Sequence, residues 1–385
     1  MKKFLIFSLF LMLGLSLASC EDEFDINKLQ DEPKLLVYCF PTECDSTVIA
    51  VYRTVPVSTD SPNTDRMARE VVEAHIIYKV NGVEMPVKRI TEEDCARLST
   101  DPEHPDNRLA GQYCAIAPQR AGDRIDVEVR AEGLPAASAS THIPEKVEAE
   151  IDDVTDNFQE LDDHHFVSRM AATFADDGSS ADYYMVRMDE KRMAGEAIGS
   201  GSSWSDGFMA GSYGVYLAYK DAFTHWDFSG VKWHRHYVTI LPDNEPVFKT
   251  SSQLDEDFGF DAYGYDDMAY FFNDQLFNGN SYTLHLDIYK NRFSINDHYS
   301  WGDWDEYAGG YYYTLQFYTL TKEYYRFIKS KNDSKNNSWA DSGLMQAAHI
   351  YSNVRGGIGI VAGYAVSAPS WWVKVEKWDH IYTEE

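Results

Sequence analysis

The strongest constraint on the fold of this sequence is a pair of Asn-Gly dipeptides placed beside short apolar runs. Asn81-Gly82 separates His75–Val80 from Val83–Val87, and Asn278-Gly279 precedes the run Ser281–Tyr289. Both residues of an Asn-Gly pair tolerate positive φ, so the dipeptide favours a tight hairpin turn between antiparallel strands. The sequence therefore predicts hairpins at both positions and an all-β fold.

Residues 34–144 contain a series of short alternating runs separated by turn signals. The runs are Lys34–Phe40, Thr47–Thr54, His75–Val80, Val83–Val87, Gln112–Ala117, Arg124–Ala131 and Ala136–Ile143. Such a density of short strands is typical of an immunoglobulin-like β-sandwich. Thr91–Leu98 is predicted to be a short helix with Thr91 as its cap.

Pro144 to Val147 is predicted to connect this sandwich to a second unit, residues 147–385, which contains all nine tryptophans. Its strand-like runs predict a larger antiparallel β-sandwich or an open barrel. The runs are Phe166–Phe174, Tyr183–Met188, Lys232–Ile240, Ser281–Tyr289, Tyr311–Leu320 and Gly359–Val366. One short helix is expected from Thr321, its cap, to about Lys331, because Tyr324, Phe327 and Ile328 form an apolar stripe at helical spacing. Lys191–Gly214 is rich in Gly and Ser and is predicted to be a long loop.

The amino terminus indicates an exported lipoprotein. After Met1-Lys2-Lys3, the apolar run Phe4–Leu17 would span about 21 Å as a helix, which is short of the ~30 Å hydrocarbon core. A secretory signal is therefore favoured over a membrane span. Leu17-Ala18-Ser19-Cys20 has the pattern of a bacterial lipobox, so we expect residues 1–19 to be removed and Cys20 to be acylated. The alternative is a buried cysteine after an ordinary signal peptide.

Residues 20–33 are expected to form an acidic tether close to the lipid. Glu21, Asp22 and Glu23 resemble the export signal that sends lipoproteins of Bacteroidetes-type bacteria to the outer face of the outer membrane. We therefore expect a lipid-anchored protein of the outer membrane that is exposed at the cell surface, with a periplasmic-facing location as the alternative. The formal net charge of −28 argues against nucleic acid or an anionic lipid surface as a partner through bulk electrostatics.

Four further cysteines lie in the first third of the chain: Cys39, Cys44, Cys95 and Cys114. An even number in an exported chain suggests disulfides, and four cysteines allow three pairings. Local spacing favours Cys39 with Cys44 across a hairpin, which leaves Cys95 with Cys114.

No sequence motif for catalysis is present, so we expect a non-catalytic protein without a cofactor. Neither a Gly-x-Ser-x-Gly elbow nor a His-Glu-x-x-His motif occurs. His234 and His236 are weak metal candidates, because residues two apart on a strand share a face. Arg235 between them disfavours a cation, and structural histidines are preferred. The acidic stretch Leu254–Asp267 does not match an EF-hand and favours a charged surface loop over a calcium site.

Clustered aromatic residues are the main candidates for ligand contacts. Tyr263, Tyr265, Trp301 and Trp304 stand in regions rich in aromatic residues. Exposed Trp and Tyr side chains stack on sugar rings or pack against peptides, whereas the alternative is that they pair across strands or fill the core.

Several segments together resemble the Bacteroidetes lipoprotein family called domain of unknown function 4249. They are the lipobox, Glu32–Val37, Gly111–Tyr113, Phe272–Gly279, Glu323–Tyr325 and Ile350–Ile360. The resemblance implies an accessory lipoprotein that works beside a TonB-dependent outer-membrane transporter and captures a peptide or glycan nutrient. An adhesin or fimbria-like interaction protein, and a surface hydrolase of glycans or proteins, are the competing hypotheses.

Overall fold

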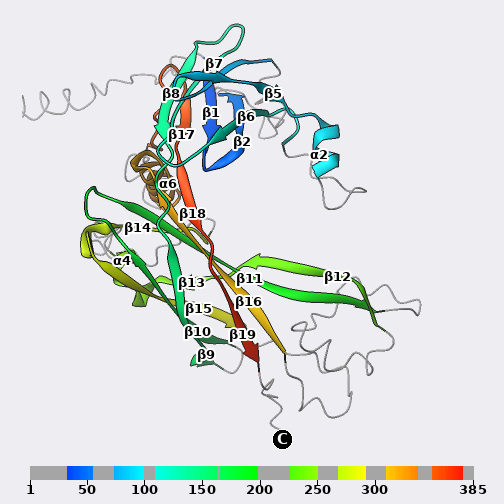
Figure 1. Ribbon diagram of the computed structural model, residues 1–385, viewed down its shortest axis with the longest axis vertical. Coiled ribbons are helices and arrows are strands. Elements are labelled where there is room, and N and C mark those ends of the chain that lie inside the picture. The colour runs from blue at the N-terminus through cyan, green and yellow to red at the C-terminus, as the bar shows by residue number, and fades with distance from the viewer. Residues whose placement is uncertain are drawn as a thin grey trace, which may run out of the picture.

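The computed structural model describes residues 33–54, 73–98, 109–162, 165–197, 226–249, 268–291, 309–336 and 349–375. These residues form four mostly antiparallel sheets, which pack in pairs as two lobes along the long axis of the molecule (Figure 1). The all-β class expected from the sequence is confirmed, and the described strands close no barrel.

The N-terminal lobe is the expected sandwich, with one sheet in the order β17-β1-β2-β6-β5 and the other in the order β4-β3-β7-β8. Its strands are β1 (Leu35–Cys39), β2 (Cys44–Arg53), β3 (His75–Val80), β4 (Val83–Met85), β5 (Val87–Arg89), β6 (Tyr113–Gln119), β7 (Arg124–Arg130), β8 (Ala137–His142) and β17 (Ile358–Val361). Alternate side chains point inward and bury one apolar core between the sheets. The Asn81-Gly82 hairpin is confirmed, since both residues have positive φ and β3 pairs with β4.

One predicted strand of this lobe is divided in two. Val83–Val87 breaks at Pro86, which has no N–H to donate to a ladder. β4 therefore stays with β3, whereas β5 pairs with β6 in the opposite sheet. Helix α2 (Glu92–Leu98) follows and has the predicted cap. The Thr91 N–H donates to the Asp94 carboxylate, and the Asp94 N–H donates to Thr91 Oγ1, both at 3.1 Å, which is a capping box.

The chain crosses the predicted boundary at residues 144–147 a second time. Everything after Val147 is predicted from the sequence to belong to the second unit, but β17 joins the first sheet of the N-terminal lobe. It runs parallel to β1, with Gly359 opposite Val37. The chain therefore leaves the N-terminal lobe, builds most of the C-terminal lobe, returns for one strand and then re-enters the C-terminal lobe with its last two described strands.

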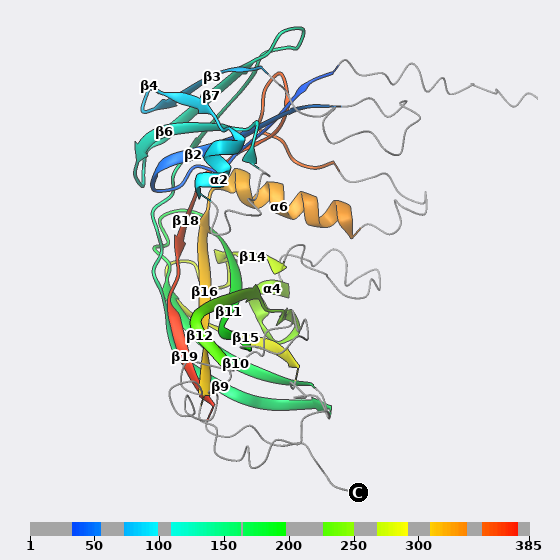
Figure 2. The same ribbon diagram turned by 90° about the vertical axis from the view of Figure 1, so that its right-hand side faces the viewer.

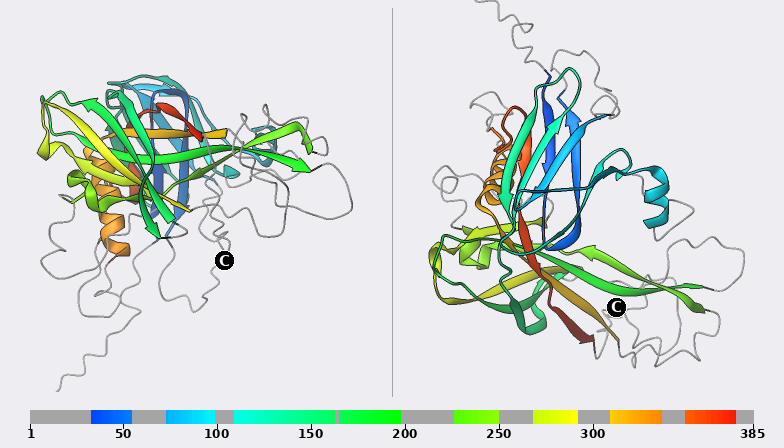
Figure 3. Two further views of the ribbon diagram at one scale, coloured as in Figure 1. Left: turned by 90° about the horizontal axis from the view of Figure 1, so that it is seen from below. Right: turned by 45° about the horizontal axis from the view of Figure 1, so that its top comes forward.

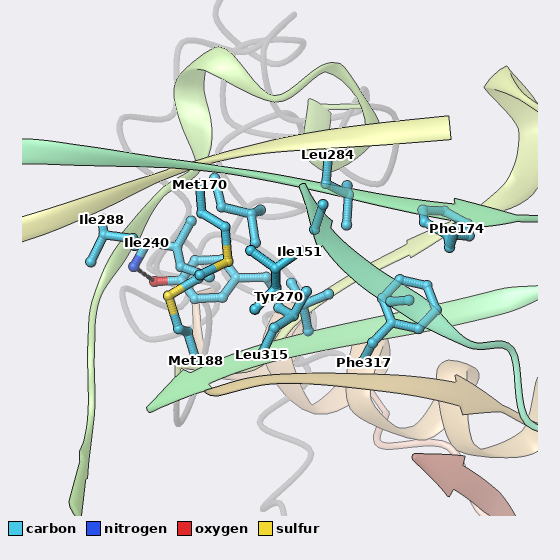
Figure 4. Packing of buried hydrophobic residues seen from close by; sticks show 14 of the residues in the cluster. Ile151, Met170, Phe174, Met188, Ile240, Tyr270, Leu284, Ile288, Leu315 and Phe317 are labelled. Carbon is cyan, nitrogen blue, oxygen red and sulfur yellow. Dashed lines mark hydrogen bonds between the residues drawn. The ribbon is translucent and has the colours of Figure 1, made fainter. Parts of the chain in front are cut away.

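The C-terminal lobe packs a sheet in the order β13-β15-β10-β9 against a sheet in the order β12-β11-β16-β18, where β14 also pairs with β11 and β19 with β16. The strands are β9 (Ala149–Asp162), β10 (His165–Ala175), β11 (Tyr183–Ala197), β12 (Trp226–Tyr237), β13 (Ile240–Leu241), β14 (Tyr270–Asn273), β15 (Ser281–Asn291), β16 (Gly309–Leu320), β18 (Tyr364–Ser367) and β19 (Ser370–Val375). Short helices are η4 (Pro242–Asn244), α4 (Pro246–Lys249) and η6 (Asp274–Leu276). Figure 4 shows the shared core, where Met170 and Ile288 of one sheet face Met188 and Leu315 of the other.

The predicted loop Lys191–Gly214 begins later than expected. β11 continues to Ala197 and pairs with β12, so the two strands form a long ribbon that projects to one side of the lobe (Figure 3). Residues 198–214 lie outside the described part of the chain.

Helix α6 (Lys322–Lys335) lies between the lobes (Figure 2). Tyr325 packs against Tyr183 of the C-terminal lobe, with ring centroids 4.7 Å apart. Tyr324 packs against Phe40, just after β1 of the N-terminal lobe, at 4.9 Å. Thr321 occupies the cap position as predicted, but its side chain makes no capping hydrogen bond. No helix among the described residues is long and apolar enough to cross a membrane.

Candidate ligand groove

A half-open groove of about 500 Å³ lies on the outer face of the second N-terminal sheet. Its floor is formed by β3, β7 and β8, whose inward residues are buried in the sandwich core and whose outward residues are mostly polar. Its far wall comes from α6 and from the segment that precedes β17. The lining residues are Ile77, Lys79, Arg124, Asp126, Val127, Glu128, Ser138, Ala139, Ser140, Glu323, Tyr351, Asn353 and Arg355.

The strand register places the floor residues in rows across the sheet. Lys79 of β3 is opposite Asp126 of β7, and Asp126 is opposite Ser140 of β8. In the next row, Glu128 stands between Ile77 and Ser138. Side chains directly opposite on one face lie about 4.5–5.5 Å apart. The groove therefore presents hydrogen-bonding groups at a regular and short spacing.

The carboxylate at the centre of the floor is held by its neighbours. Asp126 accepts hydrogen bonds from Arg124 Nε at 3.2 Å and from Ser140 Oγ at 2.5 Å. The hydrogen bonds from Arg124 lower the pKa of Asp126, so the carboxylate is ionised at neutral pH. Glu128 pairs with Arg130, whose Nε is 2.6 Å from the carboxylate.

The far wall is attached to the floor and to α6. The N–H of Arg355 donates to the Ser138 carbonyl at 2.8 Å, and the Ser138 N–H donates back to the Arg355 carbonyl at 2.9 Å. The Tyr351 N–H donates to Ser330 Oγ of α6 at 2.8 Å. The Arg326 guanidinium lies 4.2 Å from the centre of the Tyr351 ring, which fixes one aromatic ring at the groove.

A glycine-rich segment makes this wall possible. Gly356, Gly357, Gly359 and Gly363 each lie so close to a neighbouring backbone that an added Cβ would collide with it. Gly356 meets the carbonyl of Ala136, while the other three meet carbonyls on β1 or β8. Only glycine allows β17 and its flanks to lie this close to both sheets.

A second cluster of polar groups lies in the C-terminal lobe. Oxygen atoms of Asp176, Asp182 and Asp274 lie within 4.8 Å of one another, and these are the ligand type that Ca²⁺ uses. Asp176 is buried and accepts hydrogen bonds from the Tyr184 hydroxyl at 2.5 Å and the Gly279 N–H at 2.6 Å. Burial and the neighbouring carboxylates raise the pKa of Asp182.

These hydrogen bonds give the acidic cluster a structural role. Asp274 accepts from the Asp182 N–H and from Asn278 Nδ2, both at 3.0 Å, and so ties the β10–β11 loop to the turn before β15. The hairpin expected at Asn278-Gly279 is wrong: Gly279 has positive φ and the chain turns here, but β14 pairs with β11 whereas β15 pairs with β10 and β13. Sequence reasoning missed the cluster because its members are separated by up to about a hundred residues.

The aromatic residues expected to bind a ligand are not among the described residues. Tyr263, Tyr265, Trp301 and Trp304 are outside the described residues, as are Cys20, Glu21, Asp22 and Glu23. The backbones of His234 and His236 lie in β12, opposite Arg192 and Glu190 of β11. The aromatic, lipid and metal predictions therefore stay predictions.

The prediction of disulfides is wrong, because Cys39, Cys44, Cys95 and Cys114 are all free thiols. Cys39 is buried in the sandwich core, whereas Cys44 Sγ faces polar partners and is 3.2 Å from Gln119 Nε2. Cys95 is buried, and Cys114 lies on the outward face of β6, between the inward Tyr113 and Ala115. Neither pair is bonded.

The fold and the groove define a two-lobed, all-β protein whose polar site is built where the chain returns to its N-terminal sandwich. The family model of the domain of unknown function DUF4249 matches residues 21–369, and the chain belongs to that family. Comparison with curated proteins finds no match.

Proposed function

We propose that this chain is a non-catalytic, lipid-anchored protein at the outer face of the outer membrane. It binds a nutrient and assists a TonB-dependent transporter. The observation that supports it most is the groove of about 500 Å³, which lies within the ~300–1,000 Å³ range of ligand sites. Its hydrogen-bonding groups are held in place by the sheet and by α6.

The groove is better suited to holding a ligand than to hydrolysing it. Glycoside hydrolysis uses one carboxylic acid with a raised pKa and one carboxylate. Here the pKa of Asp126 is lowered by hydrogen bonds from Arg124, and Glu128 pairs with Arg130. Both carboxylates are therefore acceptors of hydrogen bonds.

The anchor rests on the sequence around Cys20. The family match begins at residue 21, directly after this cysteine. A mature chain that starts at Cys20 would carry two or more acyl chains, which anchor stably. From Cys20 to Leu35 the chain can extend at most about 50 Å, so the N-terminal lobe and its groove stay near the membrane.

Co-purification tests the proposal. The full chain with a C-terminal tag is isolated from detergent-solubilised outer membranes of its native host, and its partners are identified by mass spectrometry. We expect a TonB-dependent transporter to be recovered with the native chain. The Cys20→Ser variant should be absent from the membrane fraction and should recover no transporter. Recovery of no transporter would contradict the proposal, as would turnover of a glycan or protein polymer or self-assembly into fibres.

A further inference from the structure

The groove offers donors and acceptors side by side. In the row Lys79–Asp126–Ser140, an ammonium donor, a carboxylate acceptor and a hydroxyl stand next to one another. Glu128 and Ser138 repeat an acceptor and a hydroxyl in the neighbouring row. A ligand that matches this pattern must donate and accept hydrogen bonds at closely spaced atoms. Hydroxyl groups on a ring do both.

The groove does not suit an extended peptide. A peptide that adds to a sheet needs a free strand edge and pockets for alternate side chains. The edge of β8 inside the groove is already bridged at Ser138 by Arg355. The aliphatic lining is limited to Ile77, Val127 and Ala139, and of these only Ile77 is on the outward face, because Val127 and Ala139 pack into the sandwich core.

The charges of the groove are balanced. Lys79, Arg124 and Arg355 stand against Asp126, Glu128 and Glu323 among the lining residues. The formal net charge of the whole chain is −28, which repels polyanions at long range. A neutral ligand has no net charge for the acidic chain to repel, and it needs no excess of one charge in the groove.

Tyr351 adds an aromatic surface to the polar floor. Its ring is positioned by the Arg326 guanidinium, and its N–H is bonded to Ser330 of α6. An aromatic face beside ordered hydrogen-bonding groups suits the apolar face of a sugar ring.

From this juxtaposition we infer that the groove binds a neutral, hydroxyl-rich oligosaccharide, with Tyr351 stacking on a ring and the Asp126 and Glu128 rows bonding its hydroxyls. This inference rests on the proposed function and names the class of nutrient.

Binding is tested by calorimetry with the full-length lipoprotein in detergent. The probes are neutral hexasaccharides of glucose, mannose and xylose, uronic-acid hexasaccharides of equal length, and a pool of hexapeptides. We expect saturable binding of a neutral hexasaccharide. Tyr351→Leu should weaken it about tenfold or more, whereas Tyr351→Phe, which keeps the ring, should weaken it less than about threefold. Lys79→Ala and Arg355→Ala each remove a charged side chain from the lining of the groove, so these variants should bind the neutral hexasaccharide more weakly.

Glu84→Gln is the matched control, because Glu84 is exposed on β4 of the same sheet and does not line the groove. Its affinity should equal that of the native chain. The inference fails if no neutral hexasaccharide binds, if only uronic acids or peptides bind, or if the groove variants bind as well as the control. If the transporter co-purifies but no neutral sugar binds, the inference fails and the proposed function stands. If a neutral sugar binds but no transporter is recovered, the proposed function fails.

Discussion

Gly359 of β17 lies directly against the backbone of Val37 in β1, and a Cβ at this position would overlap the Val37 carbonyl oxygen. Gly359 also has a φ of +116°, a conformation that L side chains rarely adopt. This contact joins β17, more than three hundred residues further along the chain, to β1. The contact therefore holds in place β17 and the segment before it, which forms part of the far wall of the groove.

Gly359→Ala should destabilise the N-terminal lobe. Backbone strain costs about 1–3 kcal/mol, and the collision with Val37 adds to it. We expect a fall in Tm of several degrees in thermal unfolding followed by circular dichroism. Gly82→Ala is the control, because Gly82 also has positive φ but has no atom within 4 Å of an added Cβ. An equal effect of the two substitutions would show that the contact contributes nothing.

The threonines at the two cap positions, Thr91 and Thr321, should respond differently to replacement by valine. Thr91 takes part in a capping box, so Thr91→Val should cost about 1 kcal/mol. The hydroxyl of Thr321 is buried without a hydrogen-bond partner in the described structure, so Thr321→Val should be neutral or stabilising by about 1 kcal/mol. Denaturant unfolding of the two variants checks this. A loss of stability in Thr321→Val as large as that in Thr91→Val would show that the Thr321 hydroxyl is bonded after all.

Features set by neighbouring residues could be predicted from the sequence. The turn at Asn81-Gly82, the cap at Thr91 and the stripe on α6 each depend on residues within one turn or one hairpin. Their physical causes are φ preference, local hydrogen bonding and helical spacing. These causes act between residues that are close in the sequence, so a short segment is enough to predict them.

Features that join distant segments could not be predicted. The parallel pairing of β17 with β1 links residues more than three hundred positions apart, and no local pattern specifies it. The groove likewise combines Lys79, Asp126 and Tyr351, which are unremarkable polar residues in the sequence. Strand β9 was not predicted from the sequence, because its many exposed carboxylates interrupt the alternation of apolar and polar residues that is expected of a strand.

The stability of α2 should depend on the ionisation of Asp94. Hydrogen bonds from the Thr91 N–H and hydroxyl lower the pKa of Asp94 to about 2, below its ordinary value of 3.8. A lowered pKa means that the folded state favours the carboxylate, so this contribution is complete above about pH 4 and is lost as the pH falls through 2. A carboxyl NMR titration should give the low pKa, and Thr91→Val should return it toward 3.8. An Asp94 pKa near 4 in the native chain would rule out the capping box.

The four thiols should be detectable without reduction. Because Cys39, Cys44, Cys95 and Cys114 are free and the Cys20 sulfur is expected to be acylated, the denatured mature protein should take up four alkyl groups whether or not a reductant is added first. In the native state Cys44 and Cys114 should react before Cys39, since burial raises the pKa of the Cys39 thiol. Intact mass measured over time checks both statements. A gain of reactive thiols on reduction would establish a disulfide in the exported protein.

Glu190 and Lys290 form an ion pair between the two sheets of the C-terminal lobe, with side chains 0% and 5% exposed. Glu190→Gln removes the buried carboxylate and leaves the ammonium in the interior, which should cost about 3–5 kcal/mol. Replacing both residues, as Glu190→Leu with Lys290→Met, should recover most of that loss because neither charge of the pair is left in the core. Asp333→Asn is the control, since its pair with Lys329 on α6 is exposed and should contribute at most about 1 kcal/mol. Denaturant unfolding at neutral pH measures all three. If the double replacement is as unstable as Glu190→Gln, the cost lies in packing rather than in the loss of the ion pair.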